Sequence, residues 1–163
     1  MLAAAGNVGR MSDDVRVQQS INAPADKVWS MISDVTRMGE WSPETIACTW
    51  KGDATAPVVG AKFSGSNRNG SKTWSTVCTV TAADPGTRFA FAVDVGPVKV
   101  SHWAFEITPT ETGCTITETW TDRRGKLLKK LGKPFSGVAD RTMHNRAGME
   151  TTLQRLGVAA EAA

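Results

Sequence analysis

INAPADKVWSMISDVTRMGEWSP, residues 21–43, is the stretch of sequence that decides the fold. Its beginning suits the start of a helix, because Pro24 fits a first helical turn and Asp26 complements the positive end of the helix dipole. Val28, Ile32 and Val35 then recur at i, i+4 and i+7, the spacing of one apolar helix face. The stretch therefore predicts an amphipathic helix.

A second short helical turn is predicted from Thr36 to Trp41, and Pro43 ends it. The residues before the stretch, Val15 to Ile21, partly alternate between apolar and polar, as a half-buried strand does. The sequence therefore opens with a strand that is followed directly by two short helices.

From Ile46 to Asp122 the pattern changes to six short strands joined by tight turns. Asn69-Gly70 is the strongest two-residue hairpin signal, Asp84-Pro-Gly86 suits a type II turn, and Gly96-Pro97 and Gly113 mark two more turns. Strands connected in this way form an antiparallel meander.

The last third of the chain is predicted to be one long helix, from Pro134 to about Leu156. Its apolar stripe at helical spacing is interrupted in the middle by Thr142 and Asn145. A helix packed wholly into a dry core would rarely place polar groups there.

The order strand, two helices, six strands and long helix predicts an α+β fold in which a strongly bent sheet is covered on one face by the long helix. Most of the residues predicted to face inward from the strands carry aromatic rings. The inward-facing residues are Phe63, Trp74, Cys78, Phe89, Phe91, Trp103, Phe105 and Trp120. Such a face forms either a solid aromatic core or the wall of a cavity.

Composition sets further bounds. The chain has 163 residues, which suits one domain. Its three cysteines (Cys48, Cys78, Cys114) lack metal-ligand spacing, so they are interpreted as reduced core residues in a reducing, cytoplasmic compartment, with no metal or cofactor.

The sequence contains no apolar run of 18 residues that would indicate a membrane span. Residues 1–12 are expected to be a flexible extension without signal-peptide character, and either Met1 or Met11 is the natural start.

Several motifs resemble those of the START-like (SRPBCC) superfamily, in the branch of polyketide cyclase/dehydrase and lipid-transport proteins. They are Ile21 to Trp29, Ile32-Ser-Asp-Val35, Glu40-Trp-Ser-Pro43, Gly60-Ala-Lys-Phe63, Trp74, Asp84-Pro-Gly86, Trp103 and Gly113 to Glu118. The resemblance covers about residues 15 to 157. It implies a helix-grip fold, with a seven-stranded curved antiparallel sheet around the C-terminal helix and a hydrophobic cavity between them. The domain is expected over residues 13–157 and a tail over residues 158–163.

Within this family resemblance, three functions remain open. The first is binding or carriage of a small apolar molecule such as a lipid or polyketide, by a monomer or weak homodimer. The second is a cyclase/aromatase-type enzyme that uses the same cavity without a metal. The third is an interaction module that uses the basic segment of residues 123–133. The expected cavity lining is Ile32, Val35, Trp41, Phe63, Asn67, Trp74, Thr76, Cys78, Phe89, Phe91, Trp103, Phe105, Glu118, Trp120, Val138, Thr142, Asn145 and Met149.

Glu118 is the one candidate for proton transfer. It shares strand parity with Ile116 and Trp120, so an inward carboxyl would have a raised pKa and could act as an acid, a base or a ligand anchor. The alternative is a Glu paired with Arg or Lys at the cavity rim. The polar residues Asn67, Thr76, Thr142 and Asn145 either form a polar end for a ligand or bond to neighbouring backbone.

Positive charge is concentrated in one segment. Between Arg123 and Lys133 the chain carries six basic residues and no acid, which leaves 13 basic against 16 acidic residues elsewhere. The basic residues are Arg123, Arg124, Lys126, Lys129, Lys130 and Lys133. With the leucines among them, they predict contact with an anionic membrane or an acidic partner, the alternative being a solvated loop. Nucleic acid is not expected, because the segment lacks interleaved aromatic residues.

Overall fold

The computed structural model describes residues 14–162, with only the backbone described for residues 131–135. The elements, in chain order, are β1 (Asp14–Ile21), α1 (Ala25–Ser33), the 3-10 turn η1 (Val35–Arg37), α2 (Met38–Trp41), β2 (Thr45–Trp50), β3 (Lys62–Asn69), β4 (Lys72–Asp84), β5 (Arg88–Val95), β6 (Val98–Pro109), β7 (Cys114–Asp122), α3 (Lys126–Ser136) and α4 (Arg141–Glu161). The predicted α+β order is confirmed.

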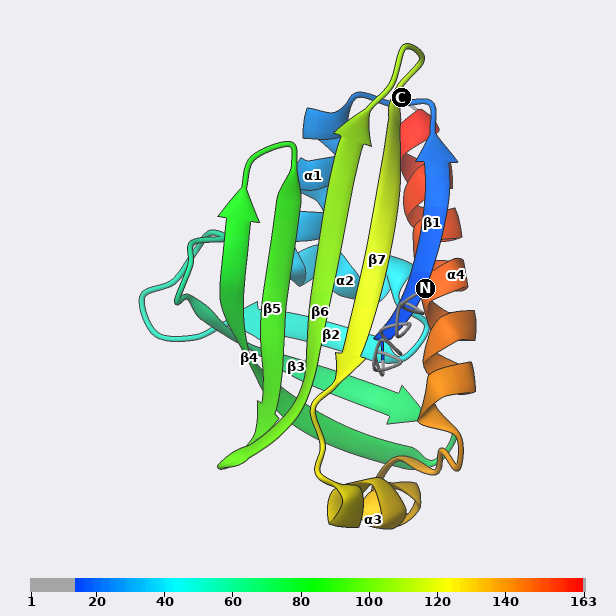
Figure 1. Ribbon diagram of the computed structural model, residues 1–163. Coiled ribbons are helices and arrows are strands. Elements are labelled where there is room, and N and C mark those ends of the chain that lie inside the picture. Colours follow the sequence, from blue (N-terminus) through cyan, green and yellow to red (C-terminus); the bar gives the residue numbers. More distant parts are fainter. Residues whose placement is uncertain (1–13, 163) are drawn as a thin grey trace, which may run out of the picture.

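The strands form one antiparallel sheet in the order β1-β7-β6-β5-β4-β3-β2. In Figure 1, β2 and β3 run across the direction of β5, β6 and β7, so the sheet is strongly bent. The register shifts by one residue at Thr81 of β4 and at Val100 of β6, and such β-bulges bend a strand locally. The helices α1 and α4 lie against the inside of this bend, which is the helix-grip architecture predicted above.

Two turns show how well local sequence sets local geometry. At Asp84-Pro85-Gly86-Thr87, Gly86 has φ +72° and the Thr87 amide donates to the Asp84 carbonyl at 3.1 Å, as in the predicted type II turn. In the β3–β4 hairpin, the two-residue loop begins one residue later than the predicted Asn69-Gly70. Asn69 pairs with Lys72, so the two-residue loop is Gly70-Ser71, with Gly70 at φ +58°. Glycine at the first loop position is the pattern of a type II′ turn.

The long C-terminal helix was predicted to begin at Pro134, and this boundary was wrong. The basic segment forms α3, Gly137 takes φ +70°, and α4 begins only at Arg141. Glycine in the left-handed region commonly ends a helix. The Asp140 side chain then accepts a hydrogen bond from the Met143 amide at 3.1 Å and caps the new helix.

The predicted tail from residue 158 is also part of α4. Ala160 is buried, the Glu161 carboxylate accepts a hydrogen bond from the Asn22 amide at 2.8 Å, and Lys27 Nζ donates to the Ala160 carbonyl at 2.6 Å. These bonds fix the end of α4 to the β1–α1 connection. The predicted extension over residues 1–12, including both candidate start sites, lies outside the described residues.

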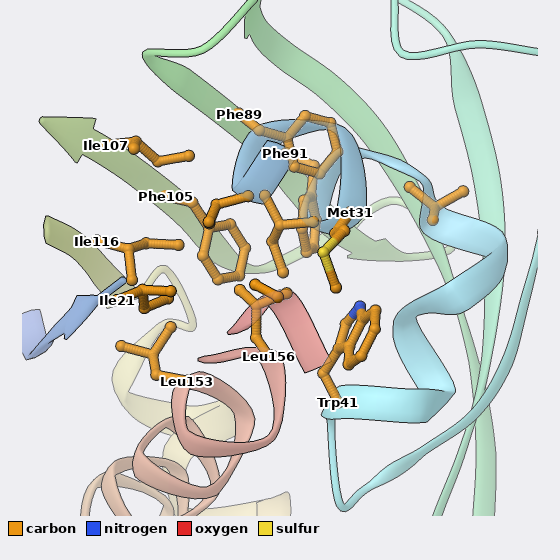
Figure 2. Close-up of a cluster of buried hydrophobic side chains, with 14 of the residues drawn as sticks. Ile21, Met31, Trp41, Phe89, Phe91, Phe105, Ile107, Ile116, Leu153 and Leu156 are labelled. Carbon is orange, nitrogen blue, oxygen red and sulfur yellow. The ribbon is translucent and has the colours of Figure 1, made fainter. Parts of the chain in front are cut away.

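A packed core fills the space between α1, the C-terminal half of α4 and the sheet. Figure 2 shows its side chains converging from these elements, among them Ile21, Met31, Trp41, Phe89, Ile107, Ile116, Leu153 and Leu156. The rings of Phe89 and Phe91 lie 5.8 Å apart between centroids. Burial of these apolar side chains provides the main stabilisation of the fold.

Candidate functional site: an apolar cavity beneath helix α4

The other half of the interior is hollow. A cavity of about 470 Å³ lies between the concave face of the sheet and the N-terminal half of α4. Its sheet wall consists of inward residues on neighbouring strands, because Phe91 pairs with Trp103 and Trp103 pairs with Trp120 in the antiparallel register. The Trp103 and Trp120 rings lie 6.4 Å apart between centroids. The register therefore stacks aromatic side chains along one wall.

Apart from Met149, the residues by which α4 lines the cavity are small or polar. Asn145, Gly148, Met149 and Thr152 of α4 line the cavity. The Thr152 hydroxyl donates to the Gly148 carbonyl at 2.8 Å, so it is satisfied within the helix. A Cβ at Gly148 would meet only Pro43 Cγ, at 3.7 Å. The cavity exists here because, of the α4 residues that line it, Met149 alone is a large apolar side chain.

The structure places most of the predicted lining residues at the cavity, but not all. Those at the cavity are Ile32, Phe63, Asn67, Trp74, Thr76, Cys78, Phe91, Trp103, Phe105, Glu118, Trp120, Asn145 and Met149. Val35, Trp41 and Phe89 lie instead in the packed core. Thr142 is exposed in the first turn of α4, and Val138 lies in the connection before α4; neither lines the cavity.

Other lining residues were not predicted. Gly148 and Thr152 continue the stripe of Asn145 at helical spacing, so the pattern held a signal for them. Cys48 had been interpreted as an ordinary core residue, yet it lines the cavity together with Cys78. Burial raises the pKa of these thiols to about 11 for Cys48 and about 12 for Cys78, so both are neutral, weakly polar parts of the wall.

Glu118 is the most unusual side chain of the cavity. It is 2% exposed, lines the cavity, and has no hydrogen-bond partner for Oε2 among the described residues. Its strand neighbours on either side are Val17 and Phe105. Burial alone raises the pKa of this carboxyl well above its ordinary value. Glu118 is therefore a buried cavity residue and not the salt-bridged rim residue of the alternative, and burial favours the protonated form of its carboxyl group.

The cavity mouth carries paired charges. Arg141 Nη1 donates to both oxygens of Glu44, at 2.8 and 3.0 Å, and its guanidinium carbon lies 5.6 Å from the centroid of the Trp74 ring. His144 Nε2 lies 3.4 Å from Glu44 Oε1. Arg124 donates to both oxygens of Asp122, at 2.9 and 2.8 Å. Both arginines at the mouth are thus paired with carboxylates, Arg124 with one two residues away in the sequence and Arg141 with one 97 residues away.

The basic segment lies next to this mouth, mostly within α3, which Figure 1 shows between the end of β7 and the start of α4. Leu128 lines the cavity, whereas Leu127 is 72% exposed. Arg123, Lys126 and Lys130 are exposed, Lys129 lies 3.8 Å from Asp122, and the Lys133 side chain lies outside the described residues. Most of the basic segment therefore forms an amphipathic helix, and the alternative of a solvated loop is wrong.

No helix within residues 14–162 is long and apolar enough to cross a bilayer. In the same part of the chain, no three His, Cys, Asp or Glu side chains gather closely enough to hold a metal ion.

A bent seven-stranded sheet closed by a long C-terminal helix defines a helix-grip protein of the START-like type. The chain belongs to the polyketide cyclase/dehydrase and lipid transport family, whose model matches residues 12–161. No curated relative matches the chain.

Among solved structures, the chain is similar to the polyketide-cyclase-like protein Cgl2372 of Corynebacterium glutamicum, with 30% identity, a TM-score of 0.57, and coverage of 93% of this chain and 90% of that one. It also resembles CV1439 of Chromobacterium violaceum, at 14% identity and a TM-score of 0.68, over 93% and 99% of the two chains. The di-domain aromatase/cyclase StfQ of the steffimycin pathway matches at 13% identity with a TM-score of 0.72, over 91% of this chain and 51% of StfQ.

Proposed function

We propose that the protein binds and carries a small apolar molecule, such as a lipid, a polyketide or a similar metabolite, in the cavity beneath α4. The observation that carries this proposal is the 470 Å³ space lined mainly by aromatic and aliphatic side chains, a volume typical of small-molecule sites. Affinity would come chiefly from buried apolar area, at about 25 cal/mol per Å². The names of related structures, an aromatase/cyclase among them, support an apolar or polyketide-like ligand.

The test is binding of an environment-sensitive apolar dye such as Nile red, with an expected stoichiometry of about one dye per chain. Gly148→Phe should block binding, because the new ring would occupy the cavity. Ala147→Phe is the matched control, since residue 147 is the preceding position of α4 and is exposed. The proposal fails if Gly148→Phe and Ala147→Phe bind the dye equally well. If Gly148→Phe alone loses the dye, native mass spectrometry and solvent extraction of the purified wild-type protein would identify the natural ligand.

An enzyme of the cyclase/aromatase type is the second candidate, and Glu118 is the observation that favours it. In that case the cavity would fold a polyketide chain and Glu118 would transfer a proton. Glu118→Gln would then abolish turnover of a polyketide substrate and leave its binding largely intact. For a carrier, the same substitution changes affinity alone.

We further propose that α3 contacts an anionic membrane during loading or release of the ligand. Lys126 and Lys130 are exposed on this helix together with Leu127, while the next residue, Leu128, faces the cavity. Exposed lysines beside an apolar side chain suit the surface of an anionic bilayer.

Sedimentation with lipid vesicles tests this contact. The protein should bind vesicles of phosphatidylcholine and phosphatidylserine more strongly than vesicles of phosphatidylcholine alone. Lys126→Glu together with Leu127→Ser should abolish the difference, whereas Lys51→Glu, an exposed position of the β2–β3 connection, should preserve it. Equal binding to both vesicle types would contradict the contact and leave an acidic protein as the remaining partner class.

A further inference from the structure

Glu118 lies where the packed core meets the cavity. Along the inward face of β7, Ile116 belongs to the packed core, Glu118 follows, and Trp120 lines the cavity. The strand ends at Asp122, beside the mouth residue Arg124. A strand rises about 3.3 Å per residue, so the four residues from Glu118 to Asp122 place the carboxyl roughly 13 Å further inside than the end of the strand. Glu118 is therefore at the inner end of the cavity.

Two buried side-chain atoms have no hydrogen-bond partner within the described part of the chain, Trp41 Nε1 and Glu118 Oε2. Trp41 lies in the packed core and does not line the cavity. Glu118 faces the cavity. An unpaired buried polar group is costly, so a partner that enters the cavity would gain from supplying the missing hydrogen bond.

The surroundings decide which partner fits. Among the described residues, the arginines that line the cavity are Arg124 and Arg141, and both are bound to carboxylates at the mouth, Asp122 and Glu44. His144, the basic residue beside them, also lies next to Glu44. Glu118 Oε2 faces the cavity without a partner, and burial without a counter-charge favours the protonated carboxyl, whose O–H group can donate a hydrogen bond. The complementary ligand group is an acceptor oxygen without charge. An amine would instead require Glu118 to ionise in an apolar site.

We propose that Glu118 is the ligand-anchoring residue of the cavity and donates a hydrogen bond to a carbonyl oxygen at the buried end of an otherwise apolar ligand. This inference rests on the proposed function, since it requires that the cavity be occupied. It narrows the ligand class to ketones, aldehydes or esters that enter with the carbonyl end first. The rings of Trp103 and Trp120 then flank the body of the ligand on the way to the mouth.

Three probes of nearly equal shape test the anchor at pH 7. They are 2-acetylnaphthalene, 2-ethylnaphthalene and 1-(2-naphthyl)ethylamine, which differ in carrying a carbonyl, a methylene or an amine at the same position. Affinities are measured by displacement of Nile red from the wild type, Glu118→Leu and Glu118→Gln. Glu106→Leu is the control, because Glu106 is an exposed residue of the neighbouring strand β6.

The ratio of ketone affinity to hydrocarbon affinity should fall about tenfold in Glu118→Leu, which loses the donor, relative to the wild type. The ratio should be largely retained in Glu118→Gln, whose amide N–H can still donate, and unchanged in Glu106→Leu.

Other outcomes separate the two proposals. An unchanged ratio in Glu118→Leu overturns the anchor but leaves cavity binding in place. A wild-type preference for the amine that Glu118→Gln removes would show that Glu118 acts as an anion and would also overturn the proposal. Failure of all three probes and of the dye to bind any variant would instead contradict the proposed function itself.

Discussion

The two halves of α4 cover two different interiors. Its C-terminal half places Leu153, Leu156 and Ala160 into a closed core, with each side chain at most 1% exposed. Its N-terminal half places Asn145 and Gly148 over the cavity. The sheet supplies large rings to both halves, so the difference comes from the helix. Several large apolar residues opposite the sheet fill the core, whereas small and polar residues around a single methionine, Met149, leave a hollow.

The first prediction tests this comparison with two substitutions on one helix face. Met149 and Leu156 are seven residues apart on α4, and their side chains are 1% and 0% exposed. Leu156→Ala should lower the free energy of unfolding by about 4 kcal/mol, because it opens a void in the packed core. Met149→Ala should cost about 2 kcal/mol, since it enlarges a cavity that already exists.

Urea denaturation of the ligand-free protein measures both losses. Equal losses, or a larger loss for Met149→Ala, would show that the N-terminal half of α4 is as tightly packed as the C-terminal half. The comparison between the two halves would then be wrong.

Much of this division was predictable from sequence. Strand alternation identified the inward rings, and the turn at Asp84-Pro85-Gly86 followed directly from its residues. The interruption of the α4 stripe at Asn145 pointed to an unusual interior, and Asn145 does line the cavity. These features depend on local chemistry and on the periods of helix and strand, which a sequence displays.

Features that depend on tertiary contacts were not predictable. The Glu44–Arg141 ion pair joins residues 97 positions apart, and no spacing rule connects them. Thr142 was assigned to the cavity because it continues the stripe of Asn145 and Met149, but α4 begins only at Arg141, so Thr142 lies in its first turn and is exposed. The stripe alone does not reveal at which residue the helix begins.

The second prediction concerns the hollow half alone. Because burial raises the pKa of Glu118, the folded state holds its proton to a higher pH than the unfolded chain, whose carboxyl has a pKa of about 4.3. The free energy of unfolding of the wild type therefore falls as the pH rises above about 4.3, until the pH has passed the pKa of Glu118 in the folded state. Glu118→Gln removes this loss, so the stability that the variant gains over the wild type should be larger at pH 7 than at pH 4.

Urea denaturation at the two pH values measures this change. Glu106→Gln, which removes an exposed carboxyl from β6, is the control and should show almost no difference between the two pH values. A Glu118→Gln variant whose gain is the same at pH 4 and pH 7 would show that the Glu118 carboxyl is solvated in the folded protein.

The third prediction compares the two halves through their glycines, and its effects are the smallest. Gly148 and Gly157 both lie within α4, where replacing glycine by alanine in a helix gains about 0.5–1 kcal/mol if there is room. A Cβ at residue 148 meets only Pro43 Cγ at 3.7 Å, an ordinary contact, so Gly148→Ala should gain this amount. A Cβ at residue 157 would lie 2.8 Å from Gln19 Nε2 and 3.5 Å from Ile21 Cγ1, so Gly157→Ala must displace the Gln19 side chain and should gain nothing. Thermal and urea melts of both variants measure the difference. A gain for Gly157→Ala as large as that for Gly148→Ala would mean that the covered end of the helix has as much free space as the end over the cavity.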